Sequence, residues 1–169
     1  GCLGLASLIT AAHPVPVCDV GLMLARDGSG SVDGDEYRIQ MDGLAAALAD
    51  RTITSALVAS KAQVTLMQWT GTGRQTVVIN WTQMNTPDDV YAFAFQVSTV
   101  PRIWRDFSTA IGEAMALSLP YFDIVPECDR RVIDISGDGV SNEGSFPSDH
   151  WPDLAAAGVT VNALVIEDT

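Results

Sequence analysis

The sequence predicts an α/β protein in which a mostly parallel β-sheet carries helices on both faces. Short apolar runs, typical of buried parallel strands, alternate along the chain with amphipathic stretches of helical periodicity. This alternation favours repeated strand–helix–strand units, which build a three-layer sandwich. At 169 residues and 47% hydrophobic composition, the chain is long and apolar enough for one domain with a substantial core.

The first elements are a buried strand and a long helix. The apolar run 20–25 predicts the strand, and the polar segment that follows it leads into a helix over 33–50. Asp33 is the expected N-cap, because Glu36 three residues later completes a capping box. The apolar residues of this helix fall on one face.

A hairpin and a second helix follow. Two strand-like segments, 62–71 and 74–82, are separated by a short turn containing Gly73, which predicts an antiparallel pair. Thr86 is then the expected N-cap of the next helix, since Pro87 suits the first helical position and two acids occupy the first turn.

The second half repeats the alternation of strand and helix. The sequence predicts, in order, a helix over 108–119, a strand over 130–136, a polar loop over 137–144, a helix over 151–158 closed by Gly158, and a strand over 159–166.

The charge and the N-terminal segment restrict the class of protein. A net charge of −12 opposes binding to nucleic acid or to an anionic membrane and favours cations or basic surfaces. Residues 1–17 carry no charged side chain and are typical of the remnant of a secretory signal. No later apolar segment has the roughly 18 residues that span a bilayer. We therefore expect an exported protein, secreted or periplasmic, whose domain occupies 18–169 with its C-terminal end cut short.

The stretch after the first strand, LARDGSGSVDGDEY, carries the most informative chemistry. Its glycines do not have the G-x-G-x-x-G spacing, and its acids would repel a phosphate. An EF-hand loop requires glycine where Val32 stands and a bidentate glutamate where Arg38 stands. Neither Ser29 nor Ser31 lies in a G-x-S-x-G elbow. These three chemistries are therefore excluded, and a site for a hard cation remains.

Three separated motifs together resemble the metal-ion-dependent adhesion site (MIDAS) of von Willebrand factor A domains. Asp27-x-Ser29-x-Ser31 follows the first strand, Thr109 begins T-x-x-G-x-A, and Asp138-Gly follows the strand RRVIDISG. The stretches SGSVDGDEY, TAIG and RRVIDISGDGVSNEG are most similar to a bacterial family of secreted proteins with this type of domain and no characterised function.

The resemblance implies a Rossmann-like α/β/α fold whose mostly parallel sheet has one antiparallel edge strand. It also implies that Ser29, Ser31 and Thr109 bind the metal directly, whereas Asp27 and Asp138 act through water or hydrogen bonds. Hydroxyl and carboxylate oxygens suit Mg²⁺, Mn²⁺ or Ca²⁺. The ion would keep one position open for a carboxylate of a protein ligand. The expected function is cation-dependent protein binding, without catalysis, and the candidates for the ligand surface are Gly139, Asn142 and Glu143.

The same fold implies a disulfide. Its first and fourth strands are parallel neighbours, and Cys18 and Cys128 precede Asp27 and Asp138 by nine and ten residues. Both cysteines are then expected just outside the N-terminal ends of these strands, opposite the metal. A Cys18–Cys128 bond would agree with export.

Two other functions stay open. A hydrolase could use the same cation to activate water, with His150, Asp149 or Glu143 as the base. Alternatively, Arg26 and Gly28, which depart from the pattern of the resemblance, could have left a metal-free interaction scaffold.

Overall fold

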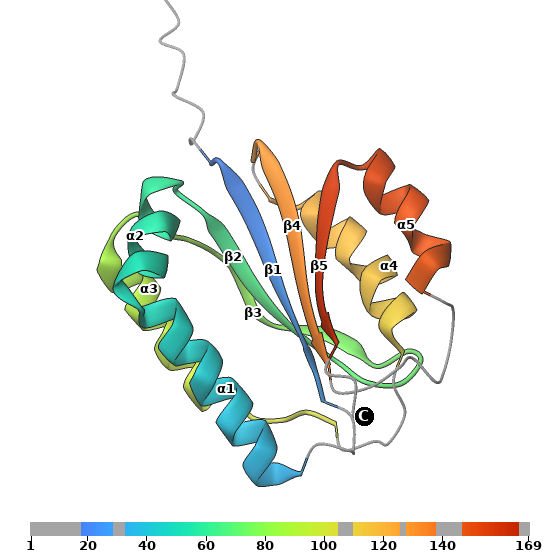
Figure 1. Cartoon of the computed structure of the whole chain (residues 1–169), viewed down its shortest axis with the longest axis horizontal. Coiled ribbons are helices and arrows are strands. Elements are labelled where there is room, and N and C mark those ends of the chain that lie inside the picture. The colour runs from blue at the N-terminus through green and yellow to red at the C-terminus, as the bar shows by residue number, and fades with distance from the viewer. Residues whose placement is uncertain (1–17, 29–32, 105–109, 126–127, 138–146, 166–169) are drawn as a thin grey trace, which may run out of the picture.

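The computed structural model describes residues 18–28, 33–104, 110–125, 128–137 and 147–165. They form a single five-stranded sheet of order β3-β2-β1-β4-β5 with five helices (Figure 1). The strands are β1 (Val20–Asp27), β2 (Gln63–Trp69), β3 (Gln75–Gln83), β4 (Arg130–Gly137) and β5 (Val159–Val165). The helices are α1 (Gly34–Ala49), α2 (Arg51–Ala59), α3 (Pro87–Thr99), α4 (Ile111–Phe122) and α5 (Pro147–Ala156).

The sheet has the predicted mixture of directions. β1 pairs in parallel with both β2 and β4, and β4 pairs in parallel with β5. Of the five strands described, only β3 runs antiparallel, at the edge beside β2. Gly73 adopts φ +73° in the hairpin turn, a conformation that glycine reaches without a Cβ clash.

Helices cover the two faces of the sheet as separate groups. α1, α2 and α3 lie on one side, and α4 and α5 on the other (Figure 1). Each group has its own apolar core, with Leu24 of β1 facing the first group and Met23 facing the second. This alternation along β1 decides which side chains near its end share a face.

The N-caps Asp33 and Thr86 are confirmed, but several helix boundaries differ, and α4 covers Ile111–Phe122 where the sequence predicted 108–119. Asp33 and Glu36 form the expected capping box of α1. The helix ends at Ala49, and Asp50 caps the start of an additional helix, α2, which the sequence did not predict. α5 begins at Pro147, four residues before the predicted start.

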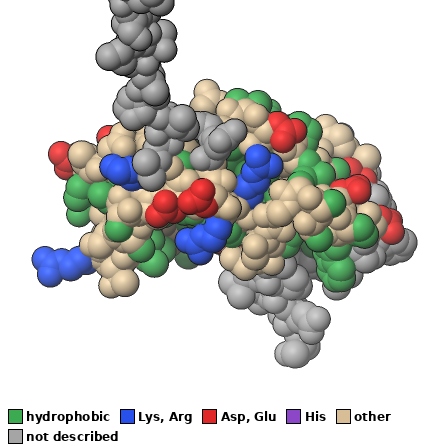
Figure 2. Space-filling model, turned by 90° about the horizontal axis from the view of Figure 1, so that it is seen from above, with side chains coloured by type: hydrophobic (Ala, Val, Ile, Leu, Met, Phe, Trp, Pro, Cys, Tyr) green, Lys and Arg blue, Asp and Glu red, His purple; other side chains and the backbone are tan. Residues whose placement is uncertain are grey.

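A disulfide connects the chain just before β1 to the chain just before β4, at the edge of the sheet where the parallel strands start. Cys18 and Cys128 form the predicted disulfide, with their Cα atoms 4.6 Å apart. Figure 2 looks onto this edge and shows acidic and basic side chains mixed over it. Near the start of β4, Arg131 Nη1 lies 3.9 Å from Oδ1 of Asp123, the residue that follows α4. Among the described residues, no helix is both long and apolar enough to cross a membrane.

Candidate metal centre

The described residues beside the three segments with predicted ligands lie at one edge of the sheet. β1 ends at Asp27, opposite Trp69 at the end of β2. On its other side, Arg26 is paired with Ser136, the residue before the end of β4. Ala110, the residue after Thr109, donates its backbone N–H to the Thr70 carbonyl at 2.9 Å, just beyond β2. Ligands of open α/β sheets bind at this carboxyl edge.

Asp27 is the predicted ligand that the structure describes. The other predicted metal ligands and ligand-surface residues lie outside the described residues: Ser29, Ser31, Thr109, Asp138, Gly139, Asn142 and Glu143. The described residues next to each of the three motifs nevertheless lie at the same edge.

The carboxylate of Asp27 is buried where β1 ends. Its side chain is 2% exposed, and it lies on the same sheet face as Met23 and Ala25, toward α4 and α5. A buried carboxylate stays ionised only where charge or hydrogen bonds compensate its desolvation. A hard cation supplies such charge, so the position and chemistry of Asp27 fit a divalent ion.

Gly28 continues from β1 with both of its backbone groups bonded. Its N–H donates to the Trp69 carbonyl at 2.7 Å, and its carbonyl accepts from Arg102 Nη2 at 2.8 Å. A Cβ on this residue would meet the Trp69 and Trp104 carbonyl oxygens at 3.5 and 3.9 Å, which are ordinary contacts. The backbone at this position is therefore held by hydrogen bonds even though the residue has no side chain.

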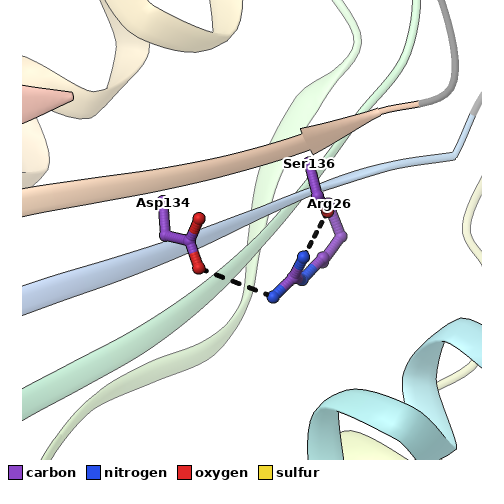
Figure 3. Close-up of polar contacts among 3 residues, drawn as sticks. All are labelled: Arg26, Asp134 and Ser136. Carbon is purple, nitrogen blue, oxygen red and sulfur yellow. Dashed lines mark hydrogen bonds and ion pairs between the residues drawn. The ribbon is translucent and has the colours of Figure 1, made fainter. Parts of the chain in front are cut away.

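Arg26 lies on the opposite face of the sheet from Asp27. Its guanidinium donates to the Ser136 hydroxyl and approaches Asp134 Oδ2 at 3.8 Å (Figure 3). Burial lowers the pKa of Arg26, and the charge of Asp134 raises it again. The positive charge is thus directed toward β4 and matched by an acid, away from the side of the sheet that carries Asp27.

Arg102 and Gln68 are site residues that the sequence did not indicate. Arg102 connects the segment that follows α3 to Gly28 at the end of β1, and Gln68 connects the same segment to β2. An arginine in a charged stretch and a glutamine in an apolar strand have no periodic signal. Only an amide in an otherwise apolar part of β2, next to its last residue, would have been a clue, since buried polar groups need partners.

The described candidates for a hydrolytic base lie on α5. Asp149 is exposed and His150 half-buried, in the first turns of the helix, while Glu143 lies outside the described residues. Within the part of the chain that the structure describes, no three His, Cys, Asp or Glu side chains are grouped closely enough to hold a metal ion.

The strand order, the single antiparallel edge strand and the helix layers define the class of protein: the fold is that of a von Willebrand factor A domain. The chain belongs to the family described as "Protein of unknown function (DUF1194)", whose model matches residues 17–169. A search of curated proteins finds no match.

Solved structures share the fold at low sequence identity. Proximal thread matrix protein 1 from the mussel byssus is 22% identical with a TM-score of 0.67, covering 88% of this chain and 38% of that chain. The same mussel protein with a zinc-occupied MIDAS motif is 19% identical, with a TM-score of 0.69 and the same coverage of 88% and 38%. An aerotolerance-related membrane protein from Bacteroides fragilis is 20% identical with a TM-score of 0.64, covering 86% of this chain and 67% of that chain. The chain thus spans well under half of the mussel protein.

Proposed function

We propose that this chain is a divalent-cation-dependent protein-binding module of an exported protein. The observation that carries the proposal is the burial of Asp27, 2% exposed, at the edge where β1, β2 and β4 end together. The backbone bond from Ala110 to Thr70 supports it, since it brings the residue that follows Thr109 in the chain to the same edge. The mussel protein, which has the same fold, has a zinc-occupied MIDAS motif, and this supports a metal-binding role for the fold.

Each predicted residue has a distinct role in this proposal. The hydroxyl oxygens of Ser29, Ser31 and Thr109 would bind the ion directly, while Asp27 and Asp138 would act through water or hydrogen bonds. When bound, the ion supplies an electrophilic position that a carboxylate can fill. A neutral set of direct ligands leaves most of the positive charge available to an aspartate or glutamate of the partner. Gly139, Asn142 and Glu143 would belong to the surface around it.

Export is the second part of the proposal. The disulfide between Cys18 and Cys128 supports it, because such bonds persist in oxidising compartments. The apolar, uncharged segment 1–17 agrees with a secretory signal. Fractionation of cells that make the full-length protein tests this part: we expect it outside the cytoplasm with the cysteines oxidised, and a cytoplasmic, reduced protein would contradict export.

Calorimetric titration of Mg²⁺, Mn²⁺ and Ca²⁺ tests the metal site. We expect the wild type to bind at least one of these ions and Asp27→Asn to bind it about tenfold more weakly. Asp134→Asn is the matched control, because it removes an acid from the neighbouring strand on the opposite face. Circular dichroism of each variant verifies that it is folded.

The outcomes separate the three functions. Absence of binding to the wild type would leave the metal-free scaffold. Binding together with metal-dependent turnover of a generic phosphoester or peptide would favour the hydrolase. Binding without turnover, weakened by Asp27→Asn and unaffected by Asp134→Asn, is the result that the proposed module requires.

A further inference from the structure

One guanidinium joins two of the segments that contain predicted metal ligands. Arg102 donates to the Gly28 carbonyl through Nη2 at 2.8 Å and Nε at 3.2 Å, and through Nε to the Trp104 carbonyl at 2.8 Å. Gly28 stands between Asp27 and Ser29 in the chain, and Trp104 lies five residues before Thr109. Arg102 therefore connects the backbone leading to the serines with the backbone leading to the threonine.

The segment that carries Arg102 is itself attached to the sheet. Gln68 of β2 is 1% exposed, and its Nε2 donates to the Pro101 carbonyl at 3.0 Å. Its Oε1 accepts from the Ile103 N–H at 3.1 Å. The residues on both sides of Arg102 are thus bonded to the buried side chain of Gln68. Trp69, the next residue of β2, accepts the Gly28 N–H at its carbonyl. Arg102 is therefore held both at its backbone, through Gln68, and at its guanidinium, through the carbonyls of Gly28 and Trp104.

We propose that Arg102 is a positioning residue of the metal centre. It fixes the direction in which the chain leaves β1, and it holds Trp104, which precedes Thr109 in the chain, beside the Gly28 carbonyl. This inference rests on the proposed metal-binding function. A site whose backbone is already held loses less conformational entropy when the ion binds, and therefore binds it more tightly. Arginine suits this role because its planar fork reaches two carbonyls at once, which a lysine ammonium on a flexible stem does not reproduce.

Charge and positioning predict opposite effects for the loss of Arg102. A cation near a metal site repels the ion, so removal of its charge alone would strengthen binding. Loss of the hydrogen bonds to Gly28 and Trp104 would weaken binding instead. The sign of the change therefore reports which effect dominates.

Arg38 provides a matched control. Both arginines line the same open pocket of about 350 Å³, and their Cζ atoms lie 5.4 Å (Arg38) and 5.9 Å (Arg102) from the centroid of the Tyr37 ring. Arg38, however, donates to the carbonyls of Ser98 and Val100 at the end of α3, not to the end of β1. The same substitution changes the charge equally at the two positions. Only the substitution of Arg102 removes the hydrogen bonds to the end of β1.

The test is titration of Mn²⁺ into the wild type, Arg102→Lys, Arg102→Gln, Arg38→Lys and Arg38→Gln. We expect both Arg102 variants to bind about tenfold more weakly, including the one that loses a like charge. The Arg38 variants should stay within about twofold of the wild type. Wild-type affinity in Arg102→Lys, or tighter binding in Arg102→Gln, would overturn the proposal while leaving the metal site intact.

Hydrogen exchange of the metal-free proteins separates this inference from the proposed function. The peptide spanning 24–33 should exchange faster in Arg102→Lys than in Arg38→Lys, because the Gly28 carbonyl loses its donors. Equal exchange in the two variants would overturn the positioning role. If the wild type binds no ion, the proposed function fails and the metal-positioning role fails with it, but the exchange difference still shows whether Arg102 orders this backbone.

Discussion

At the residue scale, alternation along β1 separates two opposite charges that are adjacent in sequence. Arg26 faces Ser136 and Asp134, with its side chain 15% exposed, whereas Asp27 is buried on the other face. Adjacent residues of a strand point to opposite faces of the sheet. The arginine that departs from the apolar pattern of the strand is therefore a component of the β1–β4 pairing.

Replacement of Arg26 tests this separation. We expect Arg26→Ala to lower the free energy of unfolding by about 1–3 kcal/mol, because a buried, charged hydrogen-bonding group is lost and Asp134 remains. Metal affinity should change by less than about twofold, since the guanidinium points toward β4 and away from Asp27, and the Coulomb interaction falls with distance. Urea unfolding and Mn²⁺ titration measure the two effects. A strong increase in affinity would mean that Arg26 weakens the site electrostatically.

At the element scale, helix starts are set by side chains that bond to free backbone N–H groups. α3 is an example: the Asp89 carboxylate accepts from the backbone N–H groups of Thr86 and Asn85, each at 2.9 Å. These bonds lower the pKa of Asp89, and the bond from the Thr86 N–H has the largest effect. Its depressed pKa means that the carboxylate stabilises the fold above the ordinary aspartate pKa of about 3.9 and ceases to do so as the pH falls through the folded value.

The pH dependence of unfolding tests this cap. Between neutral pH and about pH 3, Asp89→Asn should lose less stability than the wild type, because its amide does not titrate. Asp88→Asn makes the same charge change one position earlier in the same helical turn and should follow the wild type more closely. Thermal melts across this range give the comparison, and parallel curves for wild type and Asp89→Asn would contradict the assignment.

The elements that the sequence predicted are those with local signals. The apolar run of β1, the Gly73 turn and the Asp33 and Thr86 caps are each determined by residues a few positions apart. α2 was missed because Asp50 ends one helix and starts the next without an intervening turn. The predicted helix stopped at residue 50, and the nine residues of α2 are fewer than the window over which helical periodicity is recognised.

The site was predictable to the extent that it depends on chain order and element type. The position of Asp27 at the end of β1 follows from an apolar run ending in an acid. The role of Arg102 does not, since its bonds to Gly28 and Trp104 connect backbone groups that come together only in the folded chain. Long-range bonds to main-chain carbonyls do not depend on the identity of the residue that supplies the carbonyl, and they therefore leave no motif.

At the scale of the whole molecule, the covalent bond and the candidate metal centre occupy opposite edges of the sheet. The Cys18–Cys128 disulfide joins residues separated by 110 positions, near the starts of β1 and β4. A cross-link that closes so long a loop restricts the unfolded chain strongly. Asp27 lies at the far end of the same strand.

Removal of the disulfide should therefore affect stability and metal binding differently. We expect the paired substitution Cys18→Ser and Cys128→Ser to lower the free energy of unfolding by about 4 kcal/mol. Mn²⁺ affinity of the folded variant should remain within about twofold of the wild type, as expected for distant sites. Chemical unfolding with and without a reductant provides the first measurement. Loss of ion binding in a variant that is still folded would show that the two edges are coupled.

The position of β1 in the centre of the sheet also determines how the domain would carry mechanical load. Tension applied at Cys18 and resisted by a partner at the far edge would run lengthwise along this strand. Its hydrogen bonds to β2 and β4 lie across the direction of pull, so both parallel ladders would have to shear together. The bond to Cys128 passes part of the force directly to β4, so that two strands share the load before either ladder slips.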